Sequence, residues 1–277
     1  MDPSQPTTAS DTLPRAAEAT DLGDARTTGF RLPIGYFRWV ICALLLLGVT
    51  KNYMDRQVLG VLKTTLLHDF RWNEIDFARL VKAFQAAYAV GMLVMGWLVD
   101  RVGTRWGYAV AMVFWSVASM GTSLANSLRG FAMSRYALGF WEPAVFPASI
   151  KAVAEWFPKK ERALATGIFN AGTNIGAIVT PLVVPWIVVH WGWRAAFVGI
   201  GATGFLWLAV WLLMYRKPED HSRVSKAELQ YIQSDPQEAA RKINWAGLVP
   251  LRQTWAFALG KFLTDPIWWF YLFWVPG

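Results

Sequence analysis

The chain has 277 residues, of which 55% are hydrophobic, 15% are aromatic and only 17% are charged. This composition excludes an ordinary water-soluble domain, because so few charged residues cannot cover the surface of a folded chain of this length. The single cysteine, Cys42, excludes an internal disulfide and a cysteine-based zinc site, whereas the formal net charge of +8 has to be interpreted from where the basic residues lie.

The N-terminal segment, residues 1–30, is rich in Thr, Ala, Asp and Pro and has no apolar core. We expect a disordered tail on the cytoplasmic side of a membrane, because such a segment cannot bury enough apolar surface to fold. It lacks the short apolar stretch and small-residue cleavage site of a secretory signal peptide.

Seven apolar runs follow, most of them close to the roughly 20 residues that cross a bilayer as a helix. We place the spans at residues 37–62, 77–99, 106–124, 128–153, 163–189, 193–215 and 255–275. The sequence therefore predicts an all-α polytopic membrane protein with a lipid bilayer as its surroundings.

The basic residues between these spans are unevenly distributed. Most fall on the side of the N-terminus, and the connections on the other side hold only Lys63, Arg71, Arg129 and Arg194. By the positive-inside rule we expect a multi-pass protein of the inner (plasma) membrane with its N-terminus in the cytoplasm. Because this arrangement accounts for most of the positive charge, we expect no nucleic-acid partner.

The longest connection, residues 216–252, is polar and charged, and it favours a short amphipathic helix near residues 225–232. It separates a predicted six-helix domain, residues 31–215, from a seventh helix within residues 253–277. We expect the seventh helix to begin a second membrane domain whose remainder is missing from this sequence.

Charged residues interrupt the first apolar run at Lys51, Asp55 and Arg56. Each charge placed against lipid at the bilayer centre costs about 2.5–3.5 kcal/mol on insertion scales, so these side chains must face protein or water. Such positions usually mark a substrate or ion pathway. Lys51 lies one helical turn before Asp55, so the two charges are also able to neutralise each other.

The fourth span carries a second set of intramembrane charges. Arg135, Gly139 and Glu142 share one helical face, so Arg135 and Glu142 form either a structural ion pair or part of a central site. We favour the second interpretation and expect Asp55 and Glu142 to be proton-coupling carboxylates, with Arg135 as the charge that Glu142 engages or releases.

The connection between the second and third spans contains Gly96, Asp100, Arg101, Gly103 and Arg105. The glycines allow a tight turn and close helix approach, and we expect Asp100 to pair with one of the two arginines or a helix N-terminus. A charged surface turn is the simpler interpretation. The spacing G-x-x-x-D-R-x-G-x-R, however, resembles the signature loop of the major facilitator superfamily, in which it acts as a conformational latch.

That resemblance implies two six-helix halves with substrate bound between them at the membrane midplane. This sequence would supply the first half, built from two inverted three-helix repeats, the cytoplasmic loop and the seventh helix. The first and fourth spans are then counterparts, and both carry charges. Matching interruptions in repeated segments are a strong sequence indication of a transporter's central site.

Residues 52–57, taken with Arg135, Glu142 and residues 261–270, resemble the anion:cation symporter branch, in particular bacterial hexuronate transporters. The resemblance implies that Arg56 binds a substrate carboxylate and that Tyr53 and Tyr88 contact the sugar. The guanidinium fork matches a carboxylate in shape and charge. Further candidates for substrate contact are Gln85, Asn170, Asn174 and Trp268.

The resemblance implies proton-coupled symport of an anionic sugar acid such as galacturonate or glucuronate, with no cofactor. Galactonate, glucarate and aromatic acids remain alternatives, as does sodium coupling. An inactive transporter fragment is another alternative, and the oligomeric state is left open.

The fifth and seventh spans contain features with two interpretations each. Gly172 and Gly176 predict close helix packing, whereas Asn170 and Asn174 either bond between helices or contact sugar hydroxyls. Pro181 and Pro185 predict kinks. Lys261 and Asp265 lie one turn apart, which allows a simple pair within the seventh helix.

A membrane-embedded enzyme is the competing class. The three histidines, His68, His190 and His221, lie in loops or at span ends, and none has a second ligand at helical spacing. No catalytic motif is present, so we expect neither an enzyme nor a metal site.

Overall fold

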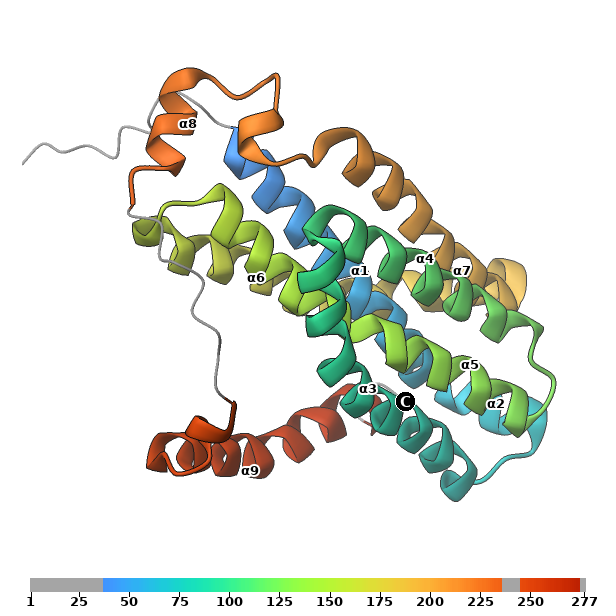
Figure 1. The fold of residues 1–277 in the computed structure, drawn as a ribbon. Helices are drawn as coiled ribbons and strands as arrows, with labels where there is room; N and C mark the ends of the chain where they lie inside the picture. Colours follow the sequence, from blue (N-terminus) through green and yellow to red (C-terminus); the bar gives the residue numbers. More distant parts are fainter. Residues whose placement is uncertain (1–36, 236–244, 275–277) are drawn as a thin grey trace, which may run out of the picture. The chain divides into compact units, whose positions relative to one another are not determined.

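The computed structural model describes residues 37–235 and 245–274 (Figure 1). The chain divides into a unit of residues 1–34 and a unit of residues 35–277, and the helices below all belong to the second. The predicted disordered tail, residues 1–30, lies outside the described residues.

The described part of the chain is helical throughout, apart from short connections. The α-helices are α1 (Phe37–Val61), α2 (Lys63–Phe70), α3 (Glu74–Val102), α4 (Thr104–Gly121), α5 (Leu128–Trp141), α6 (Val145–Trp156), α7 (Lys159–Met214), α8 (Lys226–Ile232) and α9 (Arg252–Trp274). The 3₁₀ turns are η1 (Thr122–Leu124), η2 (Glu142–Ala144), η3 (Pro218–Asp220) and η4 (Trp245–Leu248). Within residues 37–235 and 245–274, four segments are long and apolar enough to cross a membrane: α1, α3, α4 with η1, and α7.

The 56-residue helix α7 contains two of the predicted spans. The backbone departs from helical geometry at Gly192, with φ 79° and ψ 167°, a conformation that glycine adopts far more readily than other residues. The backbone angles stay helical at Pro181 and Pro185, so the helix continues through both residues, and the kinks at these prolines stay a prediction. The boundary between the fifth and sixth spans therefore lies at Gly192.

The fourth span, predicted as one helix, is interrupted in the middle. Helix α5 ends at Trp141, the 3₁₀ turn η2 contains Glu142 and Pro143, and α6 continues from Val145. Proline has no amide hydrogen and cannot make the regular α-helical bond at its position. The interruption places Glu142 at a change of helix geometry inside the bundle.

Close packing at glycines determines how these helices meet. Helix α1 makes its most extensive contacts with α7, and α3 with α5. A Cβ added at Gly172 would lie 2.5 Å from the carbonyl oxygen of Leu46, and one at Gly176 would lie 2.6 Å from that of Thr50. The predicted close packing through Gly172 and Gly176 is confirmed. Gly139 has the same role between α5 and α3, 2.4 Å from the carbonyl oxygen of Phe84.

The polar connection after the sixth span contains the predicted short helix, α8. The side chain of Ser225 accepts a hydrogen bond from the backbone N–H of Glu228, the usual arrangement at a helix N-terminus. Glu228 and Glu161 both pair with Arg38, at 3.5 Å and 3.0 Å. Arg38 is 1% exposed, so this ion-pair cluster fixes α8 to the first turns of α1 and α7.

Helix α9 contacts α1 and α3 through its last two turns. Within α9, only Leu272 and Phe273 are buried. A Cβ added at Gly60 of α1 would lie 3.2 Å from the carbonyl oxygen of Leu272, so the glycine permits this close approach. This contact positions the aromatic residues of α9 near the charged part of α1.

Candidate functional site

The polar stretch of α1 is buried within protein, as the insertion cost of its charges requires. Lys51 is 4% exposed, Arg56 is 2% exposed, and Asn52 and Asp55 have no exposed surface. Successive residues of a helix point about 100° apart, so Asp55 and Arg56 face different neighbours. Asp55 meets α4, whereas Arg56 meets the interruption between α5 and α6.

Arg56 forms an ion pair with Glu142. Its Nε lies 3.2 Å and its Nη2 lies 3.0 Å from the same oxygen, Oε2 of Glu142. Nη2 also donates to Asn52, whose side-chain amide donates to the backbone carbonyl of Glu142. These bonds connect α1 directly to η2.

Four aromatic rings surround the same guanidinium group. The Arg56 Cζ atom lies 4.7 Å from the ring centroid of Tyr53, 4.8 Å from that of Tyr88, 5.2 Å from that of Trp269 and 5.6 Å from that of Phe84. Such contacts stabilise a desolvated cation. The rings come from α1, α3 and α9, so Arg56 is the point at which these three helices meet. We call this group the Arg56 cage.

Arg135 does not pair with Glu142 in this structure, in contrast to the ion pair that we considered from their shared helical face. The helical spacing that aligns the two residues stops at Trp141, and η2 turns Glu142 towards Arg56 instead. Arg135 is fully buried, and its Nη2 makes a long 3.5 Å bond to the carbonyl oxygen of Arg56. Among the described residues, its Nε and Nη1 have no hydrogen-bond partner.

Glu142 is also incompletely bonded. Its Oε2 accepts both bonds from Arg56, but its Oε1 has no hydrogen-bond partner in the described part of the chain. Because unpaired buried polar atoms are costly, Oε1 of Glu142 is suited to accept a proton or a donor, and the free donors of Arg135 are suited to bind an acceptor.

Asp55 is paired on the opposite side of α1. Lys51 donates to its Oδ2, and Ser119 of α4 donates to its Oδ1 at 2.8 Å. Lys51 also donates to Ser116 at 3.0 Å and lies over the Trp115 ring. The pairing of Lys51 with Asp55, one of the two interpretations of the sequence, is therefore present.

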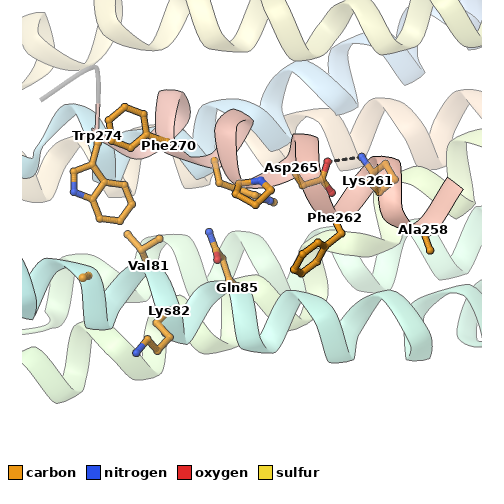
Figure 2. A pocket seen from close by; sticks show the side chains of 12 residues that line it. Val81, Lys82, Gln85, Ala258, Lys261, Phe262, Asp265, Phe270 and Trp274 are labelled. Carbon is orange, nitrogen blue, oxygen red and sulfur yellow. Dashed lines mark ion pairs between the residues drawn. The ribbon is translucent and has the colours of Figure 1, made fainter. Parts of the chain in front are cut away.

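The other predicted substrate contacts lie at varying distances from the cage. Gln85 is half-buried and points towards α9 across a groove of about 730 Å³, where Lys261 pairs with Asp265 (Figure 2). Trp268 is 42% exposed and packs edge-on against Tyr53, with 6.5 Å between ring centroids. Trp269, one residue further, is the indole that faces Arg56.

The two asparagines of α7 have different surroundings. Asn170 is half-buried, and its side chain donates to the carbonyl oxygen of Thr166, one turn earlier in its own helix. Asn174 is exposed. The interhelical bond predicted for Asn170 is thus not present among the described residues, and its contact with a sugar hydroxyl stays a prediction.

The latch loop, residues 96–105, has the predicted turn but different partners. Gly103 has φ 88° and ends α3 while starting α4. Asp100 pairs with Lys151 of α6 at 3.0 Å, rather than with either nearby arginine. Arg105 instead donates to the carbonyl oxygen of Leu212 at 2.6 Å, since the start of α4 lies against the end of α7.

Arg101 and Gly96 of this loop also differ from what we expected of them, an ion pair with Asp100 and a close helix approach. Arg101 lies over the ring of Trp97, with 5.3 Å to the centroid. A Cβ added at Gly96 would meet nothing within 4 Å among the described residues, so close helix approach does not explain this glycine.

Several residues of the site did not emerge from sequence reasoning. Phe84 and Trp269 belong to the Arg56 cage, and Ser116 and Ser119 support the Lys51–Asp55 pair. The two serines share a helical face within an apolar span, which is a detectable signal because polar residues there usually bond to a neighbouring helix.

A helical membrane protein with buried, mutually paired charges at depth is typical of secondary transporters. Residues 45–277 match the family model described as the Major Facilitator Superfamily, so the chain belongs to this superfamily of membrane transporters and not to an enzyme family.

The curated relatives include sugar-acid transporters. The chain is 37% identical over 245 residues to a hexuronate transporter of Escherichia coli K12, covering 86% of this chain and 56% of that protein. It is 35% identical over 245 residues to a galacturonate transporter of Dickeya chrysanthemi, covering 86% and 71%. A probable galactarate/D-glucarate transporter of Escherichia coli K12 is 30% identical over 260 residues, with 86% and 58% covered. The chain thus spans little more than half of two of these relatives.

Solved structures confirm the fold. A bacterial homolog of the human lysosomal transporter Spinster, in an inward-facing and unoccupied conformation, matches with a TM-score of 0.61 at 21% identity, covering 74% of this chain and 46% of that one. A D-xylose–proton symporter matches with a TM-score of 0.53 at 17% identity, covering 65% and 48%. The predicted fold class is therefore confirmed.

Proposed function

We propose that the protein transports a hexuronate or related sugar acid together with protons, by alternating access. The observation that carries this proposal is the Arg56 cage, in which a buried guanidinium has one carboxylate partner, Glu142, at 3.0 Å. A substrate carboxylate has the same charge and shape as the Glu142 side chain, so it can take the place of that group on Arg56.

Substrate binding begins with this exchange of carboxylates. The planar guanidinium of Arg56 offers parallel N–H donors to both substrate oxygens. Tyr53 and Tyr88, whose side chains bond to Trp268 and Arg56, can exchange these bonds for sugar hydroxyls, while the rings of the cage contact the apolar face of the sugar. Gln85, Asn170, Asn174 and Trp268 remain candidates for further contacts around the sugar.

Proton coupling follows from what happens to Glu142. Once the substrate occupies Arg56, an ionised Glu142 would be a buried charge without its partner, which is strongly unfavourable. Two outcomes relieve this cost: a proton on Oε1, which has no partner among the described residues, removes the charge, and engagement of the free donors of Arg135 compensates it. Protonation allows the carrier to close around a neutralised load.

Alternating access requires the two repeats of the transporter to rearrange around the site. We assign α1, α3 and α4 to one repeat, and α5 with α6 and the two halves of α7 to the other. The pair between Asp100 and Lys151 joins α3 to α6 across these repeats, so the latch loop is placed to influence which side opens. The N-terminus is proposed to lie in the cytoplasm.

The first test measures uptake of radiolabelled galacturonate and glucuronate by cells that produce this protein and lack other uptake systems for these acids. Uptake is measured with and without a protonophore. We expect uptake that the protonophore abolishes. Competition with galactonate, glucarate and an aromatic acid ranks the substrates, and replacing sodium tests the alternative coupling ion. Absence of uptake of all these acids would refute the proposal.

Two substitutions separate binding from coupling. Arg56→Lys should lose most uptake, because a lysine lacks the fork that binds both carboxylate oxygens; the matched control is Arg79→Lys, at a position of α3 where the arginine side chain is 63% exposed. Glu142→Gln should retain exchange of labelled for unlabelled substrate while losing accumulation against a gradient. Its control, Asp69→Asn, changes a carboxylate that is 44% exposed. Wild-type accumulation by Glu142→Gln would exclude its coupling role.

A further inference from the structure

The two buried carboxylates of the site differ in how their oxygens are bonded. Both oxygens of Asp55 accept hydrogen bonds, one from the Lys51 ammonium group and one from the Ser119 hydroxyl at 2.8 Å. Glu142 uses one oxygen for Arg56, and its Oε1 is free within the described residues. Glu142 therefore has an unbonded oxygen for a proton, whereas each oxygen of Asp55 already accepts a hydrogen bond.

A proton on Asp55 would also meet an unsuitable neighbour. A lysine ammonium group is a donor of three hydrogens and cannot accept a hydrogen bond, so an O–H at Oδ2 would face another donor. Protonation would leave Lys51 as a buried cation without its anion, in a position that is 4% exposed. The geometry fits the ionised form of Asp55.

The surroundings of Lys51 form a site shaped for an ammonium group. The Lys51 Nζ donates to Ser116 at 3.0 Å and lies 5.3 Å from the centroid of the Trp115 ring. On the other side, Gly204 of α7 leaves the necessary space, because a Cβ there would lie 2.9 Å from Nζ and 2.1 Å from the Ser116 Oγ. Three helices therefore contribute to holding this cation beside Asp55.

The helices packed around Asp55 bring further groups near this carboxylate. Arg135 of α5 and Glu142 of η2 both act on it electrostatically, with opposite signs. Ser116 and Ser119 of α4 are uncharged, and the approach from α7 is through Gly204. Among the described residues, Lys51 is the cation that pairs with Asp55 directly, and this pairing favours the ionised form of the carboxylate.

We infer that Lys51 and Asp55 form a permanent internal ion pair that exchanges no proton during transport, and that Glu142 alone carries the coupled proton. This inference rests on the proposed function and replaces the sequence-based expectation that both carboxylates are coupled. Its consequence is a stoichiometry of one proton for each monocarboxylate, so that a transport cycle moves no net charge.

The charge movement can be measured on the wild-type protein in proteoliposomes. A pH gradient and a galacturonate gradient are opposed until net flux reverses, and a potassium gradient with valinomycin sets the membrane potential. One proton for each monoanion predicts a reversal point that is independent of the potential. A reversal point that shifts with the potential, as it would for two protons, overturns the inference. Absence of any sugar-acid flux refutes the proposed function itself.

A double substitution tests the pair separately. Lys51→Met and Asp55→Asn each leave one buried charge alone, so both single variants should accumulate little substrate. The double variant removes both charges and should accumulate at least several-fold more than either single variant, with the accumulation still sensitive to a protonophore.

Two results of the double variant would contradict the inference. A double variant that exchanges labelled substrate but no longer accumulates it would make Asp55 a coupling carboxylate. A folded double variant, judged by gel filtration in detergent, that does neither would also contradict a dispensable pair. If the double variant does not fold, the reversal measurement on the wild-type protein decides.

Discussion

The close packing of α1 on α7 makes Gly176→Ala an informative substitution. The added methyl carbon would lie 2.6 Å from the carbonyl oxygen of Thr50 and 2.8 Å from the Cβ of Tyr53, whereas ordinary contact begins near 3.4 Å. The backbones must therefore separate by about 0.8 Å, the difference between 3.4 and 2.6 Å. Overpacking of this kind typically costs about 1–3 kcal/mol.

A matched control separates the cost of overpacking from the effect of alanine on helix propensity. Gly167, also in α7, has nothing within 4 Å of an added Cβ among the described residues, so Gly167→Ala changes only helix propensity, which favours alanine by about 1 kcal/mol. Both variants gain this propensity term. We therefore expect Gly176→Ala to be less stable than Gly167→Ala by about 1–3 kcal/mol in thermal unfolding of the purified protein in detergent.

The same displacement should affect binding. Tyr53 belongs to the Arg56 cage and lies directly against Gly176, so separating the helices shifts the cage. Binding sites lose function when their groups move by more than about 0.5 Å, and we expect weaker galacturonate uptake in Gly176→Ala but not in Gly167→Ala. Equal stability and equal uptake of the two variants would refute the packing argument.

Three further predictions concern the connections between the helices. Arg38→Met should destabilise the protein by about 3–5 kcal/mol, because it leaves the buried carboxylate of Glu228 without its cation. Limited proteolysis should then cleave the chain after α8 faster than in the wild-type protein. Gly103→Ala should cost about 1–3 kcal/mol in thermal unfolding because of its φ of 88°. The control is Gly96→Ala within α3, where an added Cβ meets nothing within 4 Å among the described residues, so it should gain only the helix propensity of alanine, about 1 kcal/mol. Burial lowers the pKa of His221 below its usual 6.5, so the folded protein binds fewer protons than the unfolded chain and stability should fall as pH decreases through 6.5. A His221→Gln protein should lose less stability between pH 7.5 and 5, and an unchanged pH profile would contradict this assignment.

Features that depend on neighbouring residues in the chain were predictable. Gly172 and Gly176 lie four residues apart on one helical face, and Lys51 and Asp55 have the same spacing, so their packing and pairing follow from helix geometry alone. Ser225 begins α8 for an equally local reason, its bond to the Glu228 amide three residues later.

Partners on different helices were not predictable in the same way. Glu142 pairs with Arg56 and not with Arg135 because of the 3₁₀ turn at Pro143, which a continuous helical wheel does not represent. The choice between Trp268 and Trp269 depends on how α9 is rotated by its last turn. Residue spacing defines a face of a helix, but the neighbouring helix defines which face meets the site.

The contrast between Asp55 and Arg56 shows why adjacent residues of one helix can have separate roles. Asp55 has a partner from its own helix, one turn away, and this partner stays with it through any rigid movement of α1. The partner of Arg56 lies on η2, so that pair can separate when the helices move or when another carboxylate competes. A proton on Glu142 weakens its hold on Arg56, and substrate on Arg56 favours that proton. Because such coupling is reciprocal, the factor by which proton binding strengthens substrate binding equals the factor by which substrate strengthens proton binding. In the proposed mechanism, the ion pair that joins two helices is therefore the one that couples the proton to the sugar acid.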